Sequence, residues 1–288
     1  MAQAAAKTGT GPTVMVAIEQ WFPDHQRILV DDLALAILPF GARAFVHATR
    51  PSPIRNWMVR ATERAFPGLW SGIMCRKRFI DDALLAASSE IDAVVNLGAG
   101  FDTRAYRLQS LAAIPVWEVD QPANIRSKQY GIRRRFGVVP PHITLAPVDF
   151  DHEALGPALL SRGYAPAKRT FFIWEAVTQY LSQAGIRSTL QLLAAAAPGS
   201  RLAFTYVQKD FIDGRNLYDQ PRLYQRYVKQ KIWLFGLDPG AVASFLDPYG
   251  WRVTAHVGCD DLAERFVKPT GRRLLASPLE RIVCAEKL

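Results

Sequence analysis

The sequence predicts an α/β fold built on a seven-stranded, mostly parallel sheet whose last strand is antiparallel. From residue 91 onward, short apolar runs alternate with helical patterns, which is the rhythm of parallel strands joined by helices. No long helical pattern follows residue 266, so the final strand can return beside its predecessor in the opposite direction. The predicted strands are residues 91–97, 114–119, 142–148, 170–174, 200–207, 251–257 and 279–286, and the predicted helices between them are 102–109, 121–135, 152–162, 183–197 and 239–249.

A helical extension is predicted over residues 14–90, before the first strand. Apolar residues recur at helical spacing from Val14 to Leu38, and Pro23 divides that pattern into two helices. Proline and glycine break the pattern again near Pro39 and Gly41, and further helices are expected at 54–66 and 73–88. Residues 1–13 are small and polar and lack the apolar core of a signal peptide, so a disordered tail is expected there.

Composition excludes several classes of protein. With 49% apolar and 21% charged residues among 288, the chain reads as one large globular domain, 91–288, carrying the extension. The +9 net charge comes from scattered arginines and lysines, which indicates a solvated basic surface rather than a nucleic-acid site. Three widely spaced cysteines form no metal-ligand pattern, so no metal is expected. No apolar run approaches the ~18 residues that span a bilayer, and we expect a cytoplasmic monomer or homodimer with no membrane partner.

The glycine turn Gly98-Ala99-Gly100 follows the first strand and opens a helical pattern, so a ligand could touch the backbone there. Thr103 replaces the third glycine of a dinucleotide fingerprint, which favours S-adenosylmethionine (SAM) over NAD. Asp120 ends the next strand 22 residues after Gly98, where an acid can hold a ribose. It could also cap the helix that begins beside it.

Two further strand ends carry candidate site residues. Asp149, Phe150 and Asp151 end the third strand, where an acid such as Asp149 can accept from an adenine amine and the backbone of the next residue faces the ring. Asp151 fits better as the cap of the following helix, and without the other motifs both acids would be taken as turn residues. A wholly apolar strand, 170–174, ends in Glu175, and Tyr180 follows five residues later. A carboxylate placed directly after a buried strand needs a partner, which a ligand ammonium or a neighbouring arginine would supply.

The segment 208–236 is an insertion between the fifth strand and the next helix. It is dense in aromatic residues and arginine and lies just past the carboxyl end of a strand, where ligands bind in parallel sheets. We therefore expect a lid over the site, formed together with the N-terminal helices. The alternative is an amphipathic helical pair that only packs.

Four motifs in order resemble the leucine carboxyl methyltransferase family: NLGAGFDTRAYRL, WEVDQP, PVDF and FIWEAVTQYLS. That family includes protein phosphatase methyltransferases, bacterial polyketide O-methyltransferases and actinobacterial SAM-dependent methyltransferases. The resemblance covers roughly residues 14–210 and implies a Rossmann-like class I methyltransferase fold with SAM as methyl donor. The chain departs from the family pattern at Ala176, where a glycine is common, and in the insertion.

The resemblance also implies a role for each motif residue. In the helix that carries RKRFIDD, Arg76 would hold the SAM carboxylate, and Arg78 competes with it because either could point inward. Gly98 would contact the amino-acid portion of SAM within the turn that includes Ala99 and Gly100. The remaining implied contacts are Asp120 to the ribose, Asp149 and Phe150 around the adenine, Glu175 to the amino-acid end, and Tyr180, the catalytic candidate, facing the methyl acceptor.

The predicted reaction is in-line methyl transfer from SAM to a carboxylate or hydroxyl of a small molecule, such as a polyketide, leaving S-adenosylhomocysteine (SAH). A carboxylate acceptor needs no base but needs a cation, for which Arg215, Arg222 and Arg226 of the insertion are candidates. A hydroxyl acceptor needs a nearby base, and His47 is the most suitable of the five histidines. The alternatives are methylation of a protein's C-terminal carboxylate and SAM binding without catalysis. Nucleic acid is not expected as a partner, because no Asn/Asp-Pro-Pro-Tyr motif occurs.

Overall fold

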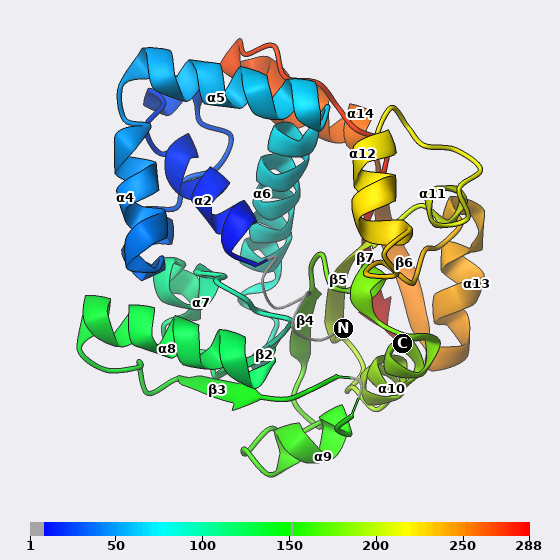
Figure 1. The fold of residues 1–288 in the computed structure, drawn as a ribbon. Coiled ribbons are helices and arrows are strands. Elements are labelled where there is room, and N and C mark those ends of the chain that lie inside the picture. Colours follow the sequence, from blue (N-terminus) through cyan, green and yellow to red (C-terminus); the bar gives the residue numbers. More distant parts are fainter. Residues whose placement is uncertain (1–8, 151) are drawn as a thin grey trace.

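A seven-stranded sheet forms the centre of the protein in the computed structural model, which describes residues 9–150 and 152–288 (Figure 1). The strand order is β3-β2-β1-β4-β5-β7-β6, and β7 runs antiparallel to both of its neighbours. The predicted topology, with an antiparallel last strand, is therefore confirmed. The strands are β1 Ala93–Leu97, β2 Val116–Asp120, β3 Ile143–Pro147, β4 Thr170–Trp174, β5 Arg201–Val207, β6 Trp251–Val257 and β7 Glu280–Lys287.

Helices cover both faces of this sheet, because successive strand residues point to opposite sides. On β4, Phe171 and Ile173 pack into the core beneath the long helix α6 (Leu69–Ala87), whereas Phe172 and Trp174 pack into the core beneath α10 and α13. All five β4 residues are buried, as expected of a central parallel strand. Outside the insertion, the helices that follow β1 in the chain are α7 Arg104–Arg107, α8 Pro122–Phe136, α9 Leu155–Leu160, α10 Gln183–Ala194, α13 Val242–Leu246 and α14 Cys259–Leu262.

The long helix α6, Leu69–Ala87, separates the N-terminal extension from the insertion. In Figure 1 the blue helices α2, α4 and α5 lie on one side of α6, and the yellow α12 lies on its other side. Helix α2 begins at Thr10, so the predicted disordered tail is wrong for residues 10–13, and residues 1–8 of that prediction lie outside the described residues. The other helices of the extension are α3 Ala34–Ile37, α4 Phe40–Ala48 and α5 Ser52–Ala65.

A buried acid ties the extension to the rest of the protein. Glu19 of α2 is fully buried and accepts a hydrogen bond from the Trp70 indole at 2.7 Å. Its other carboxylate oxygen pairs with Arg272 at 2.6 Å, and the Arg272 guanidinium lies 4.0 Å from the Phe22 ring centroid. A hydrogen-bonded, paired carboxylate is the form in which a charge can remain in an apolar core.

The insertion folds as short helical turns over a small core of its own. It contains α11 Lys209–Ile212, α12 Pro221–Leu223 and a π-helical turn, Tyr224–Val228. Phe211 and Leu223 pack there against Val207 and Leu279. Between residues 9 and 288, apart from residue 151, no helix combines the length and apolar character that crossing a membrane would require.

Short 3-10 and π turns complete the chain between these elements. They are η1 Asp24–Gln26, η2 Gln109–Leu111, η3 Thr178–Tyr180, η5 Pro239–Ala241, η6 Asp247–Tyr249, η7 Ala263–Val267 and η8 Lys268–Thr270.

A second buried ion pair lies between β2 and α8. The Lys128 ammonium is 2.7 Å from the Glu118 carboxylate, with 0% and 1% of the two side chains exposed. The Tyr106 hydroxyl donates to the other Glu118 oxygen at 2.8 Å. Burial raises the pKa of Glu118, and both partners act against that rise by stabilising the carboxylate.

Candidate functional site

The predicted cofactor residues meet at one edge of the sheet. Gly98, Asp120, Asp149 and Glu175 each lie at or directly after the carboxyl end of β1, β2, β3 or β4, and these strands are neighbours in the sheet. The chain leaves β1 for β2 on one side, and β4 continues to β5 on the other. Ligands of open α/β sheets bind in the crevice at such a change of direction.

The glycine turn is fixed by its backbone before any ligand is considered. Gly98 has φ +77°, and a Cβ on it would lie 2.2 Å from a methyl group of Val177. Its N–H and that of Ala99 both donate to the Val119 carbonyl, at 2.8 and 2.9 Å. Only glycine fits this position, because a side chain would both strain the backbone and overlap Val177.

Asp120 is held with its carboxylate toward the turn. One oxygen accepts from the Gln121 N–H and the Asn124 amide, at 2.6 and 2.7 Å, and the other accepts from the Gly100 N–H at 2.6 Å. Burial raises the pKa of Asp120, against the three hydrogen bonds that lower it. A carboxylate accepts about four hydrogen bonds, so one position remains beside Gly100, which suits a ribose hydroxyl.

Asp149 and Phe150, which follow Val148 after the end of β3, lie in different surroundings. Asp151, the expected helix cap, lies outside the described residues. The Asp149 carboxylate is 3.1 Å from the ring nitrogen Nδ1 of His152, near the surface. Phe150 is buried in the core that also contains Leu155. Their contacts with an adenine stay a prediction.

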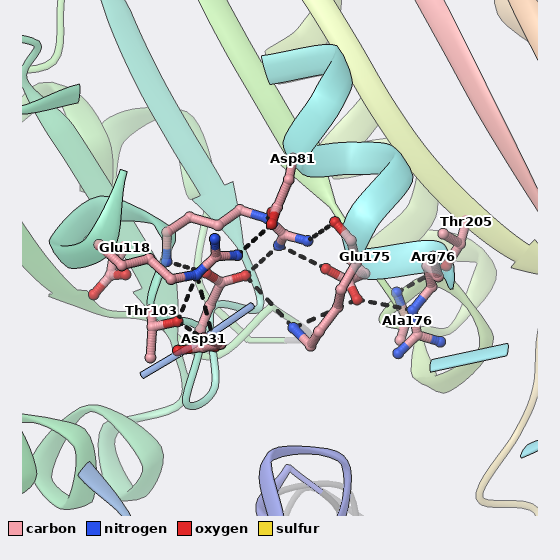
Figure 2. A network of polar contacts seen from close by, with 12 residues as sticks. Asp31, Arg76, Asp81, Thr103, Glu118, Glu175, Ala176 and Thr205 are labelled. Atoms are coloured by element: carbon pink, nitrogen blue, oxygen red, sulfur yellow. Dashed lines mark hydrogen bonds and ion pairs between the residues drawn. The ribbon is translucent and has the colours of Figure 1, made fainter. Parts of the chain in front are cut away.

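Glu175 is the centre of a buried polar network (Figure 2). Its carboxylate, 7% exposed, lies 2.8 Å from Arg76 Nε, 2.7 Å from Arg104 Nη1 and 3.6 Å from Lys77 Nζ. Burial alone would raise the pKa of Glu175, but Lys77, Arg104 and Arg76 together lower it to about 2. The sequence analysis expected either a ligand ammonium or a neighbouring arginine as the partner of Glu175, and the structure shows two arginines there.

Arg76 is the inward-pointing arginine of its helix. Its Nη1 lies 2.6 Å from Glu280 in addition to the Glu175 contact, whereas Arg78 is 44% exposed and pairs with Asp82 on the same helix. Burial acts to lower the pKa of Arg76, but Glu280 and Glu175 raise it above its ordinary value. Arg76 therefore enters the site already paired with two carboxylates.

A hydrogen-bond chain joins this pair to the backbone after β4. Glu280 accepts from the Thr205 hydroxyl at 2.7 Å, and that hydroxyl accepts from the Ala176 N–H at 2.8 Å. Ala176 has φ +56°, the left-handed conformation that favours glycine. The departure from the family pattern at Ala176 therefore places a side chain where the backbone favours none.

Several charged residues of this network were not predicted from the sequence, among them Asp31, Lys77, Asp81, Arg104 and Glu280. Arg104, 2% exposed, pairs with Asp81 at 2.5 Å and with Asp102, and Thr103 donates to Asp31 at 2.6 Å (Figure 2). Glu280 is the member at the start of β7. Its signal in the sequence was an acid at the start of the last apolar run, because an antiparallel strand begins at the edge where parallel strands end.

A cavity of about 510 Å³ opens beside this edge. Arg76, Ala176, Gln179, Tyr180 and Glu280 line its inner end. The rest of the wall comes from the extension, α6, the insertion, α14 and β7 with the residues around them. It is mostly apolar and includes Met15, Ile18, Phe45, Met58, Phe66, Trp70, Ile73, Leu223, Trp233, Leu262 and Ile282. The insertion and the extension thus wall one cavity, as the lid prediction requires.

The predicted cations for a substrate carboxylate are placed unevenly. Arg226 lines the cavity, while Arg215 and Arg222 lie outside its wall. The Arg215 side chain is 65% exposed and pairs with Asp213 at 3.0 Å. His47 also lies outside the wall, although its neighbour Phe45 contributes to it.

Comparison with known structures gives the fold. A DUF574 family protein from Streptomyces avermitilis superposes with a TM-score of 0.56 at 15% identity, covering 82% of this chain and 91% of the other. A protein from Thermobifida fusca described as a "putative methyltransferase" superposes with a TM-score of 0.57 at 13% identity, covering 81% and 88%. Both support a Rossmann-like class I methyltransferase fold.

Sequence relatives give the family. A Frankia alni protein named "putative S-adenosyl-L-methionine-dependent methyltransferase" is 32% identical over 183 residues, which are 63% of this chain and 62% of that protein. A Mycobacterium tuberculosis protein of the same description is 30% identical over 223 residues, which are 72% of this chain and 63% of that protein. The chain thus spans somewhat more than three fifths of these relatives. The family model described as leucine carboxyl methyltransferase matches residues 9–194, well over half of the sequence, and the chain belongs to that family.

Proposed function

We propose that this protein binds SAM and transfers its methyl group to an oxygen of a largely apolar small molecule. The observation that carries the proposal is the cavity of about 510 Å³, which reaches the cofactor edge at Ala176 and Tyr180. Its volume lies in the range of small-molecule pockets. Its wall is mostly apolar, with a few polar side chains that include Arg76, Tyr180 and Glu280 near the sheet edge, which is the pattern of a site that binds and orients such a molecule.

The residues at the sheet edge suit the methyl donor. Asp120 has one acceptor position left beside Gly100, where a ribose hydroxyl can donate. The turn at Gly98 brings backbone close to the crevice without a side chain. SAM, when bound, supplies an electrophilic methyl carbon on a sulfonium.

The task left to the protein is alignment and exclusion of water. Holding two reactants in line is worth ~7–11 kcal/mol of barrier when the geometry is close to that of attack. The extension and the insertion, which wall the cavity from both sides of α6, would provide that enclosure. We further propose that Tyr180, which lines the inner end, contacts the acceptor and that the reaction needs no divalent metal.

A ligand-binding measurement tests the cofactor half of the proposal. SAH at 100 times its dissociation constant should stabilise the protein by ~2.7 kcal/mol, which for a chain of this size raises the melting temperature by several degrees. Asp120→Ala should remove most of that shift, and Asp82→Ala on the outer face of α6 should keep it. A shift that survives in Asp120→Ala, or no shift in the natural protein, would contradict the proposal.

A labelling experiment tests catalysis and separates the alternatives. The protein is incubated with methyl-labelled SAM and a cell extract, and the label is followed into small molecules and proteins. Label in an extractable small molecule, retained after EDTA treatment, supports the proposal. Label at a protein C-terminus would instead support carboxyl methylation of a protein. Binding of SAH with no label transferred would support a SAM-binding protein without catalysis.

A further inference from the structure

Three residues that line the cavity each carry a buried polar atom with no hydrogen-bond partner among the described residues. These atoms are the side-chain oxygens of Gln179 and Gln220 and the indole nitrogen of Trp233. The Gln179 and Gln220 residues are only 4% and 2% exposed. A buried polar group without a partner destabilises the folded protein, so three such groups around one cavity indicate a ligand that completes their hydrogen bonds.

The orientation of Gln220 follows from its other contact. Its amide nitrogen donates to the carbonyl oxygen of Pro67, and a carbonyl can only accept. The amide oxygen of Gln220 is therefore the atom without a partner, and it can only accept. A ligand that satisfies it must carry an O–H or N–H group.

Gln179 and Trp233 lie next to the predicted acceptor position. The backbone carbonyl of Gln179 accepts from the Leu234 N–H at 2.6 Å, which joins η3 to the insertion. The Trp233 ring meets the Tyr180 ring edge to face, with centroids 6.2 Å apart. Gln179 and Trp233 thus lie where η3 contacts the insertion, beside Tyr180.

The charges at the inner end disfavour a carboxylate acceptor. Arg76, which could hold one, already donates to both Glu175 and Glu280, at 2.8 and 2.6 Å. Arg226, the other arginine in the described wall, is exposed to solvent on the insertion. A substrate carboxylate near Arg76 would face two like charges, and like charges at close range raise the energy of the ionised form.

We infer that the methyl acceptor is a neutral hydroxyl compound, a phenol or enol on an apolar ring system, whose polar groups donate to Gln179 and Gln220. This inference rests on the proposed function and names its acceptor group. The acceptor oxygen forms a bond to the methyl carbon as the carbon–sulfur bond breaks, with that electron pair passing to sulfur. The hydroxyl proton passes to Glu280, the one carboxylate among the described residues of the wall, and then to water. The products are a methyl ether and SAH.

Matched ligand pairs test the acceptor group. In the presence of SAH, binding is measured by calorimetry for 2-naphthol and 2-naphthoic acid, and for 2-hydroxyanthraquinone and anthraquinone-2-carboxylic acid. The hydroxyl member of at least one pair should bind at least tenfold more tightly than its acid. Equal or tighter binding of the acids, or binding of no hydroxyl compound, overturns the inference.

Substitutions test the two glutamines. Gln179→Leu and Gln220→Leu should each weaken binding of the hydroxyl compound about 3- to 10-fold, the equivalent of one neutral hydrogen bond. Gln225→Leu on the same insertion is exposed and lies outside the wall, so it should change nothing. Unchanged binding in both cavity variants would overturn the inference.

Glu280→Gln separates the two kinds of acceptor by kinetics. With a hydroxyl acceptor, loss of the proton acceptor should lower kcat at least tenfold while KM changes little. With a carboxylate acceptor, removal of a like charge would lower KM and leave kcat unchanged. SAH binding by each variant shows that it is folded, and it separates failure of this inference from failure of the cofactor site itself.

Discussion

Arg76 of α6 and Glu280, the first residue of β7, lie 204 positions apart in the sequence and form an ion pair of 2.6 Å at the carboxyl edge of the sheet. The antiparallel direction of β7 makes this contact possible. Glu280 faces Val207, the last residue of β5, in the strand register, so the start of β7 and the end of β5 share one edge. A helix before the sheet and the final strand thus jointly fix the position of Arg76 at this edge.

Replacing the two arginines of α6 should have unequal effects. Arg76→Ala leaves Glu280 without its arginine and removes one of the charges around the buried Glu175, so we expect a loss of about 3–5 kcal/mol in the free energy of unfolding. Arg78→Ala removes an exposed i,i+4 pair with Asp82, worth about 0.3–0.5 kcal/mol. Urea unfolding of both variants measures this. Similar losses in the two would show that the inward position of Arg76 has been misjudged.

The two glycines of the turn should differ in their tolerance of alanine. Gly98→Ala places a Cβ 2.2 Å from Val177 on a backbone with φ +77°, and we expect a severe loss of stability or of soluble protein. Gly100→Ala has φ +43° but meets only the Asp120 carboxylate, at 3.9 Å, so the loss should be about 1–2 kcal/mol. Thermal unfolding distinguishes them, and an equally mild effect of Gly98→Ala would contradict the geometry.

Ala176→Gly should stabilise the protein. Ala176 has φ +56°, a conformation that costs a non-glycine residue about 1–2 kcal/mol. Substitution by glycine removes this cost, but the greater entropy of glycine in the unfolded chain offsets part of the gain. We expect a gain of about 0.5–1 kcal/mol in urea unfolding. Ala61→Gly within helix α5 is the matched control and should lose about 1 kcal/mol. Loss of stability in both would refute the assigned backbone strain.

Removing one partner of the Glu118–Lys128 pair should be more harmful than removing both. Lys128→Met leaves a fully buried carboxylate with only the Tyr106 hydroxyl as partner, and a loss of about 3–5 kcal/mol is expected. The double variant Glu118→Leu/Lys128→Met removes the uncompensated charge and should recover much of that loss. A double-mutant cycle by chemical unfolding gives the coupling, and additive losses would contradict it.

The lowered pKa of Glu175 predicts that the free energy of unfolding decreases in acid. Its pKa is about 2 in the folded protein, below the ordinary 4.5, because the attraction of Lys77, Arg104 and Arg76 outweighs its burial. A depressed carboxyl pKa stabilises the fold above the unfolded value, and this contribution, ~3 kcal/mol, is lost as the pH falls from 4.5 toward 2. The buried acids Asp31 and Asp120 have raised pKa values and act in the opposite direction.

Unfolding free energies measured between pH 5 and pH 2.5 test this. The slope should be smaller in Glu175→Gln than in the natural sequence, and Glu264→Gln, at an exposed pair, should leave the slope unchanged. An unaltered slope in Glu175→Gln would contradict the predicted linkage.

The sheet was predictable because each of its buried strands has a recognisable local sequence pattern. Buried parallel strands appear as apolar runs such as the one that ends in Trp174, and the lack of a long helix after residue 266 indicated the reversed last strand. The boundaries were less exact, since the helix predicted at 102–109 is only Arg104–Arg107 followed by a 3-10 turn. There the Asp102 carboxylate accepts the Arg104 N–H, a local bond that competes with the first helical turn.

Helix α4 was not predicted because a proline and a glycine, residues that usually interrupt helices, lie at its start. Pro39 immediately precedes the helix and Gly41 lies in its first turn. Proline is compatible with a helix start, where its missing N–H would have no intrahelical partner. The apolar spacing of residues 40–48 should therefore have outweighed those two residues.

The candidate site was predictable strand by strand but not as a set of pairs. Each acid at a strand end was visible, and parallel strands bring such residues to one edge. The choice of Arg76 over Arg78, and the pairing of Glu175 with Arg104, depend on how α6 rotates against the sheet. Helical periodicity did not decide that rotation, because α6 is apolar around much of its circumference.

The place of β7 in the sheet has a consequence for how the molecule assembles. β7 comes after β6 in the sequence yet lies between β5 and β6, so β6 is joined to the rest of the sheet only through β7. The pairing of β7 with β5 brings together residues that are distant in the sequence, and such contacts are slow to form. Until that step is complete, Arg76 lacks Glu280, and the pocket for the acceptor has an open side.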